Sequence, residues 1–276
     1  MELGRLGVWT TYRRIGEENA REAAALAEQL GYTAFWLGGS PRLPKVRALL
    51  EATEALIVGT SIVNVWACDP AELAAEYSAL EDDFPGRLVV GIGVGHPEAT
   101  SRYRKPLTAM REFLDGVDAA SAPIPPERRC LAALGPKMLD LSAARSLGAL
   151  PYFVPVEHTA DARRRLGAAP LLAPEIAMAV EADHERGRSL AREYAASYLR
   201  LTNYASNLLR HGFTDDDVRD GGSDRLIDAV VPHGSADELA AVVQAHFDAG
   251  ADHVAIQTIG ESGIPRLGWT ELAGLL

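Results

Sequence analysis

The stretch from Leu56 to Pro97 constrains the fold most strongly, because it reads as one complete βαβ unit. It opens with a β-branched apolar run, continues with Asp69 before Pro70, and ends in a second apolar run over 88–92. Apolar runs without alternation are typical of strands buried on both faces. Aspartate followed by proline is typical of a helix N-terminus. The unit therefore predicts a parallel sheet.

The rest of the chain repeats this alternation of strand and helix. Besides the two strands of the central unit, strand patterns cover Leu3–Trp9, Thr33–Leu37, Cys130–Leu134, Tyr152–Val156, Glu175–Glu181 and His253–Thr258. Between about Asp183 and Val231, helical patterns follow one another without a strand, which indicates an insertion before the last unit. Eight strands alternating with helices predict an α/β fold, a (β/α)8 TIM barrel whose helical insertion covers the mouth.

Composition restricts the number of domains, the partners and the cellular compartment expected for this barrel. The 276 residues are 47% hydrophobic without a low-complexity linker, so we expect a single domain over 1–276. The net charge of −11 disfavours nucleic acid and anionic membranes as partners. Cys68 and Cys130 lie in apolar surroundings, which favours buried thiols in a reducing compartment. With no signal-peptide pattern and no spanning run, we expect a cytoplasmic protein.

Polar residues and glycines follow the two strands of the central unit. Asn64 comes after the first, and Gly93, Gly95 and His96 come after the second. In parallel α/β folds, ligands bind outside the carboxyl ends of the strands. The turn at 91–97 matches a dinucleotide fingerprint poorly, because a proline and not a helix follows it. Glycines that let the backbone approach a planar ligand explain it better.

A second candidate element follows the fifth strand. Leu134, Gly135, Pro136 and Lys137 precede a helix, whose N-terminus favours an anion. The alternative is an ordinary turn with a solvated lysine. An expected small-molecule substrate therefore has two loops to contact at one barrel mouth.

Titratable residues at strand ends are candidates for proton transfer. His96 and His158 are both expected just past strand ends, where they can face a common pocket. A structural histidine explains either one alone better, whereas the two together at one barrel mouth favour function. No metal site is expected, because Glu157 and His158 lack a third ligand. Tyr198, Asn203, Tyr204 and Asn207 on the insertion are interpreted as packing residues, with contacts from a lid as the alternative.

Four segments carry a resemblance to a known family. They are TSIVNVWACDPAELAAEYSALEDDFPGRLVVGIGVGHPE, YRKPLTAMREFLD, LAALGPKMLDLSAARSLGALPYFVPVEHT and DAGADHVAIQ. In this order they resemble the luciferase-like monooxygenase superfamily of flavin and deazaflavin barrel enzymes. The most similar subgroup is the coenzyme F420-dependent oxidoreductases of actinobacterial type. The resemblance implies a homodimer paired through helices near the second and third strands.

The resemblance implies a set of cofactor-binding residues. They are Ser61, Ile62, Asn64, Gly93, Gly95, His96, Leu134, Gly135, Pro136, Lys137 and Met138. It implies that the peptide from Ser61 to Ile62 is cis and backs the ring of the cofactor. Two positions depart from the family pattern. Gly39 and Ser40 stand where many deazaflavin dehydrogenases have an acid and a histidine, and His96 stands where some have a glutamate.

These implications lead to a hypothesis of an oxidoreductase that moves a hydride between coenzyme F420 and a small organic substrate, with His96 and then His158 managing protons. The alternatives are an FMN-dependent monooxygenase of the same family and a non-catalytic flavin- or deazaflavin-binding protein. Basic residues favour F420, whose tail is anionic. They are Arg42, Lys45 and Arg47 after the second strand, and Arg102, Arg104 and Lys105 after the fourth. The alternative for each group is a set of solvated charges.

Overall fold

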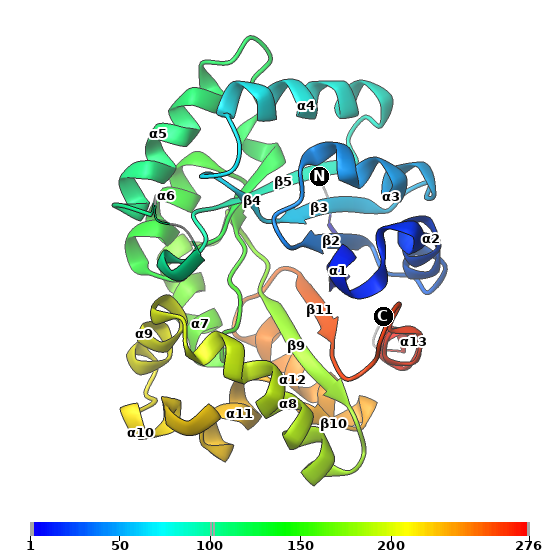
Figure 1. The fold of residues 1–276 in the computed structure, drawn as a ribbon, viewed down its shortest axis with the longest axis vertical. Coiled ribbons are helices and arrows are strands. Elements are labelled where there is room, and N and C mark those ends of the chain that lie inside the picture. The colour runs from blue at the N-terminus through cyan, green and yellow to red at the C-terminus, as the bar shows by residue number, and fades with distance from the viewer. Residues whose placement is uncertain (1–2, 100, 102, 275–276) are drawn as a thin grey trace.

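Parallel strands surrounded by helices form the body of the molecule in the computed structural model, which describes residues 3–99, 101 and 103–274 (Figure 1). The strands are β1 (Leu6–Thr10), β2 (Ala34–Gly38), β3 (Ile57–Ser61), β4 (Val63–Asn64), β5 (Leu88–Gly93), β6 (Arg129–Leu131), β7 (Gly148–Ala149), β8 (Leu171–Leu172), β9 (Glu175–Val180), β10 (His233–Gly234) and β11 (Val254–Thr258). Their order along the sheet is β10-β9-β11-β1-β2-β3-β5-β6-β7-β8, with β4 beside β5. The expected parallel sheet is confirmed.

The segment 171–180, which contains β8 and β9, joins the two ends of this order. On one side, the Leu171 amide donates to the Leu147 carbonyl at 2.8 Å. On the other side, the Ala255 amide donates to the Pro174 carbonyl at 3.0 Å, and β9 pairs with β11. One continuous segment thus bonds to both neighbours, which closes the ring of the predicted (β/α)8 barrel.

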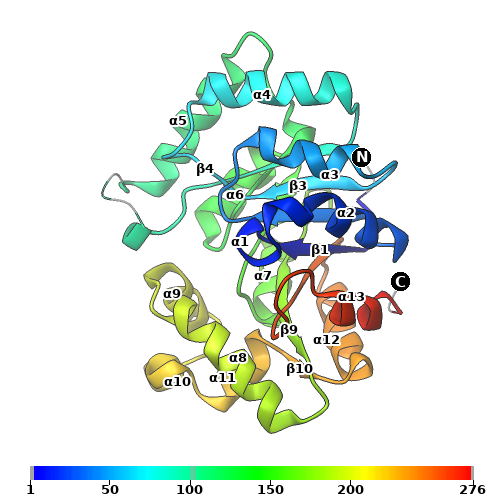
Figure 2. The ribbon, with the colours of Figure 1, turned by 45° about the vertical axis from the view of Figure 1, so that its right-hand side comes forward.

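Helices cover the outside of the ring and build the insertion. The α-helices are α1 (Tyr12–Ile15), α2 (Ala20–Gln29), α3 (Arg47–Glu51), α4 (Pro70–Asp83), α5 (Pro106–Asp118), α6 (Pro136–Arg145), α7 (Val156–Leu166), α8 (His184–Leu199), α9 (Thr202–Arg210), α10 (Asp215–Val218), α11 (Asp224–Val230), α12 (Ala236–Asp248) and α13 (Arg266–Ala273). Both ribbon views place α8–α11 together at the end of the molecule opposite α4 (Figure 2). Within the described ranges, no helix combines the length and apolarity that crossing a membrane requires.

The residues that start the helices act as the sequence indicates. The Asp69 side chain accepts from the amides of Ala71 and Glu72 at 2.9 and 3.1 Å, and Pro70 opens α4. A capping box between Ser235 and Glu238 opens α12. Side-chain capping satisfies amides that have no partner within the helix. These caps fix where the helices leave the barrel strands.

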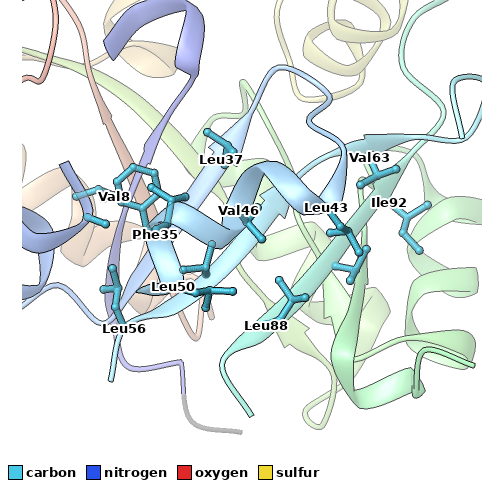
Figure 3. Close-up of a cluster of buried hydrophobic side chains, with 14 of the residues drawn as sticks. Val8, Phe35, Leu37, Leu43, Val46, Leu50, Leu56, Val63, Leu88 and Ile92 are labelled. Carbon is cyan, nitrogen blue, oxygen red and sulfur yellow. The ribbon is translucent and has the colours of Figure 1, made fainter. Parts of the chain in front are cut away.

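Successive residues of the strands belong to two different hydrophobic cores, one between the strands and the outer helices and one inside the barrel. Val8 and Phe35 pack against the outer helices with residues such as Val46 and Leu50 (Figure 3). Their chain neighbours Trp9 and Trp36 belong to a second cluster with Val89, Cys130 and Leu150. Because successive strand residues point to opposite faces, this second cluster fills the inside of the barrel.

The sixth strand differs from its predicted position. The prediction placed it at Tyr152–Val156 after a helix ended by Gly148, but β7 lies at Gly148–Ala149 and Val156 begins α7. A Cβ on Gly148 would lie 1.9 Å from the Leu171 carbonyl oxygen, so this glycine permits the close approach of two strands. The apolar residues after it form a loop between two prolines, in which Phe153 has a φ of 56°.

Candidate active site

A cavity of about 700 Å³ opens at the carboxyl ends of the barrel strands. Its walls come from the segments after β1, β2, β3, β5, β6 and β7, and from α8 and α9 of the insertion. The predicted site residues that line it are Ser61, Ile62, Asn64, Gly95, His96, Leu134, Gly135, Pro136, Lys137 and Met138. Gly93 and His158 are not among its lining residues. The insertion contributes to this mouth, as predicted.

The wall formed by β3 and β5 is built by close packing. The peptide bond between Ser61 and Ile62 is cis, as expected from the family resemblance. Gly93 lies behind it, because a Cβ there would come within 2.6 Å of the Ile62 Cγ1 atom. Gly95 adopts a φ of 62°, and a Cβ there would meet the Asn64 side chain at 2.8 Å. Gly93 therefore makes room for a lining residue, and its predicted contact with the cofactor stays a prediction.

The loop before α6 has the features of an anion site. Gly135 is the N-cap, Pro136 is the first helical residue and Lys137 follows. A Cβ built on Gly135 would meet no atom within 4 Å, so the backbone there is open to the cavity. A helix N-terminus carries a partial positive charge and amides that favour anions. The residues present thus fit the phosphate of a flavin or deazaflavin.

His158 lies beneath this loop, in the first turn of α7, and is 1% exposed. Its Nε2 lies 3.1 Å from the Leu134 carbonyl oxygen, to which it donates, and its ring packs at 5.0 Å from that of His211. Burial lowers the pKa of His158 to about 4, so the ring is neutral at pH 7. The expected place at a strand end was wrong, because the sixth strand ends earlier. Contact with Leu134 makes His158 a positioning residue for the anion loop, and its proposed role in proton transfer stays a prediction.

His96 lies at the cavity and contacts the insertion. Its Nδ1 is 3.1 Å from Asn203 Oδ1, and its ring centre is 5.2 Å from that of Tyr204. Because Nδ1 carries the hydrogen in that contact, Nε2 of the neutral ring keeps a lone pair. Two residues on, the Glu98 carboxylate accepts from the Thr202 amide and hydroxyl at 3.1 and 2.9 Å. These bonds join the loop after β5 to α9.

Several lining residues escaped the sequence analysis as site residues. They are Trp9, Thr11, Tyr103, Tyr152, Tyr198, Asn203 and Tyr204. The misplaced sixth strand hid Tyr152, which follows β7 directly, while Tyr198, Asn203 and Tyr204 were interpreted as packing. Gly39 and Ser40 line the cavity after β2, and none of the described lining residues is an aspartate or glutamate. Nor do His, Cys, Asp and Glu side chains gather in threes as metal ligands anywhere in the described ranges.

The two basic groups near the mouth differ in their surroundings. Arg42 pairs with Glu72 at 2.8 Å and also with Glu76. The other members are paired too, Lys45 with Glu17 and Arg47 with Asp83. By contrast, Arg104 and Lys105 form no ion pair with another described residue, and Arg102 lies outside the described residues. The second group is therefore the better candidate for an anionic ligand.

A barrel whose mouth combines an apolar cavity, a glycine turn and an anion loop defines a cofactor-dependent α/β-barrel enzyme. The chain belongs to the luciferase-like monooxygenase family, which it matches over residues 3–253. This finding confirms the family and the fold expected from the sequence.

Two curated relatives carry the names of oxidoreductases. The F420-dependent glucose-6-phosphate dehydrogenase of Microbacterium testaceum is 27% identical over 125 residues, so the match spans 37% of this chain and 37% of the relative. The 5,10-methylenetetrahydromethanopterin reductase of Archaeoglobus fulgidus is 24% identical, across 88% of this chain and 93% of the relative.

Solved structures share the fold. An F420-dependent secondary alcohol dehydrogenase in complex with an F420-acetone adduct superposes with a TM-score of 0.78 at 15% identity, covering 99% of this chain and 98% of the other. The oxygenating constituent of 3,6-diketocamphane monooxygenase from Pseudomonas putida, in complex with FMN, superposes with a TM-score of 0.70 at 14% identity, covering 98% and 96%. The fold is thus shared by a deazaflavin enzyme and a flavin enzyme.

Proposed function

We propose that this protein is an oxidoreductase that transfers a hydride between coenzyme F420 and a small organic substrate at the barrel mouth. The observation that carries the proposal is the pairing of a largely apolar cavity with the open helix N-terminus at Gly135 and Lys137. An apolar cavity fits a tricyclic ring, and the helix N-terminus fits its phosphate. Relatives that are F420-dependent by name support the same cofactor.

The residues of the chain divide the work around the bound cofactor, which supplies the hydride chemistry. Lys137 and the N-terminus of α6 hold the anionic group. Ser61 and Ile62 form the wall of the cavity on the β3 side. Asn203 orients His96, whose Nε2 exchanges a proton with the substrate. The insertion excludes water from the mouth.

Free cations at the rim favour F420 over FMN. The F420 tail is anionic and the protein carries a net charge of −11, so tail binding requires local positive charge. Arg104 and Lys105 offer it next to Pro106 and Leu107, which line the cavity. FMN has no such tail and gains nothing from these cations.

Charge reversal at this rim is expected to weaken F420 binding selectively. Arg104→Glu or Lys105→Glu should lower F420 affinity about fivefold, because an exposed charge pair in water contributes about 1 kcal/mol. The loss should shrink as salt is added, whereas FMN affinity should stay unchanged. Fluorescence titration at two salt concentrations measures both, with Arg164→Glu on the outer face of α7 as the matched control. Equal F420 affinity in all three variants would remove Arg104 and Lys105 from the site.

Turnover tests the function itself. The purified protein is mixed under anaerobic conditions with reduced F420 and a panel of small ketones, aldehydes and enones. Substrate-dependent oxidation of reduced F420 is the expected result. Oxygen consumption with reduced FMN in place of this reaction would favour the monooxygenase. Tight F420 binding without turnover on any substrate would favour the non-catalytic binding protein.

The assembly is inferred from the family likeness, and the location from the cysteines and the lack of a signal-peptide pattern in the sequence. We propose a homodimer in the cytoplasm. The apolar residues of α4, which are Leu73, Tyr77 and Leu80, are buried within the protomer, so a dimer through this region uses other residues of the helix. Light scattering at micromolar concentration measures the assembly, and a monomer mass there would exclude the dimer.

A further inference from the structure

We propose that Tyr152, Tyr194 and Tyr198, here named the phenol cluster, bind the reacting oxygen of the substrate by hydrogen-bond donation. The substrate class is a small uncharged carbonyl compound or the corresponding alcohol. This inference rests on the proposed function, because it assigns the substrate side of the same cavity. Gly39 and Ser40 replace the acid and histidine of related dehydrogenases, so other residues must provide the polar groups that contact the substrate. The phenol cluster can provide them.

The hydroxyl groups of the phenol cluster converge on one point. The Tyr152 hydroxyl lies 2.7 Å from that of Tyr194 and 2.8 Å from that of Tyr198. Gln257 Oε1, on β11, accepts from Tyr152 at 3.1 Å and from Tyr194 at 3.2 Å. Tyr152 and Tyr198 line the cavity. Residues from the loop after β7, from α8 and from β11 thus meet at the mouth.

A count of donors shows why the phenol cluster favours an oxygen ligand. The phenol cluster has three hydroxyl hydrogens. Among the described residues outside the cluster, Gln257 Oε1 is the acceptor that bonds to it. Tyr152 and Tyr194 both reach this oxygen, while the Tyr198 hydroxyl bonds to the hydroxyls of Tyr152 and Tyr194 instead. A substrate oxygen in the cavity can therefore take the Tyr198 hydrogen without leaving Tyr152 or Tyr194 unpaired. The site thus has a donor that an acceptor on the substrate can use.

The electrostatic surroundings keep these hydroxyls as donors. Burial raises the pKa of Tyr152 and Tyr194 well above 10, and that of Tyr198 is raised for the same reason. Glu175 on β9 interacts electrostatically with all three tyrosines. Its side chain is 3% exposed, and burial raises its pKa well above its usual range. Burial thus favours the uncharged form of this carboxyl, and that form places no negative charge near an oxygen that gains charge during reaction.

The walls around the phenol cluster select an uncharged substrate. The Trp9 ring lies 5.4 Å from that of Tyr152, and Phe153 stacks on Tyr198 at 5.2 Å. Lys137 is the one lysine or arginine among the described lining residues, and it belongs to the anion loop before α6. Arg14, whose charge acts on Tyr194, donates to the carbonyls of Thr258 and Glu261 and does not line the cavity. A carboxylate or phosphate on the substrate would therefore find no cation among the described lining residues on the side of the phenols, and burying an unpaired charge is costly. A neutral carbonyl meets only donors and apolar rings.

The reaction balances with these groups. The carbonyl carbon gains a C–H bond from the hydride of the reduced deazaflavin, which is oxidised by two electrons. The electron pair of the C=O π bond moves to the oxygen, where Tyr198 donates its hydrogen bond. His96 takes a proton from water at Nε2 and passes it to this oxygen, which completes the hydroxyl and leaves hydroxide in the solvent. The Tyr204 ring, 5.2 Å from His96 and 5.6 Å from Tyr198, connects the two groups.

Tyr198→Phe tests the assignment while keeping the aromatic ring. With reduced F420 and cyclohexanone, kcat/KM should fall about 100-fold, the usual loss for one donor to an oxyanion. Binding of cyclohexanone should weaken about fivefold, because a neutral hydrogen bond contributes about 1 kcal/mol. Methylenecyclohexane, which has the same shape without the oxygen, should bind both proteins equally. Tyr12→Phe, whose hydroxyl contacts the Lys45 carbonyl outside the cavity, is the matched control.

The outcomes separate this proposal from the proposed function. Unchanged cyclohexanone binding and turnover in Tyr198→Phe would overturn the phenol assignment, and faster turnover of carboxylates or phosphates than of neutral carbonyls would overturn the substrate class. Absence of F420 binding in the wild type would overturn only the proposed function, because the two-ligand binding comparison needs no cofactor. Tyr152→Phe, which removes the hydroxyl on which the others converge, gives a second variant should Tyr198→Phe fold poorly.

Discussion

Lowering the pH from 7 to 5 is expected to destabilise the fold strongly, because three buried histidines are neutral in it. Burial lowers the pKa of His158, His246 and His253 to about 4 each. An unfolded histidine has a pKa near 6.5, so the unfolded chain binds more protons below that pH. Stability is therefore fully present above pH 6.5 and is lost as the pH falls towards 4.

Hydrogen bonds show what protonation would break. His253 donates from Nδ1 to the Gly4 carbonyl at 2.9 Å and accepts at Nε2 from Trp36 at 3.0 Å. A second proton would remove the acceptor, which joins the barrel interior to β11. His246 contacts the Thr159 hydroxyl at 2.8 Å. Both rings are neutral parts of the packed core.

The expected size follows from linkage. Below the unfolded pKa, each pH unit lowers the free energy of unfolding by about 1.4 kcal/mol for every histidine that stays neutral in the folded protein. The three histidines together therefore lower it by about 5 kcal/mol between pH 7 and 5. Glu175 acts oppositely, because its raised pKa makes the folded state gain stability as the pH falls towards 4.5. It offsets part of the loss from the histidines, which is large beside a typical stability of about 5–15 kcal/mol.

Urea unfolding at several pH values measures this loss. His246→Gln should remove about one third of the histidine contribution to this dependence, since one of three similar groups is removed. The matched control is His184→Gln, at the exposed start of α8, which should leave the dependence unchanged. A free energy of unfolding that stays constant from pH 7 to 5 would contradict the account of three neutral, buried histidines.

His96→Ala is expected to lower turnover about 100-fold while F420 affinity stays nearly unchanged, because general acid–base catalysis contributes at least that much. His96 lies at the cavity, is oriented by Asn203 and has a lone pair at Nε2. The anion loop, which holds the cofactor in our proposal, is a separate wall. Loss of the imidazole therefore affects the proton and leaves the binding of the phosphate intact.

Steady-state kinetics with reduced F420, together with fluorescence titration, separates these two effects. The pH dependence of kcat/KM is the second readout, because a proton-transfer residue changes its shape and a packing residue does not. His184→Ala, at the exposed start of α8, is the control. Full turnover in His96→Ala would show that this ring serves only to hold the insertion through Asn203.

The sequence predicted the barrel because its strongest signals are local. The apolar runs, the Asp69 cap and the glycine turn each determine a few neighbouring residues. The sixth strand was misplaced because β7 has only two residues. Gly148 is required there because the backbone of Leu171 on the next strand comes close to it. The apolar residues 152–154, between Pro151 and Pro155, have the sequence pattern of a strand but form a loop. Long-range contact, and not local preference, decides this position.

Most of the predicted cofactor residues lie at the cavity because they follow strand ends directly. The phenol cluster was missed for a physical reason. Tyr194 and Tyr198 sit on an amphipathic helix, where sequence spacing does not distinguish core packing from contact with a cavity. Their meeting with Tyr152 depends on how α8 packs across the mouth, which no local pattern encodes. His158 was misjudged for the same reason as the sixth strand.

Parallel titration of the purified protein with F420 and FMN tests the central claim most directly. Fluorescence reports both ligands, and Lys137→Glu, at the anion loop, provides a variant that should weaken either one. The account predicts saturable F420 binding that weakens with added salt, and weaker FMN binding that depends less on salt. Tight, salt-insensitive FMN binding with no measurable F420 affinity would contradict it.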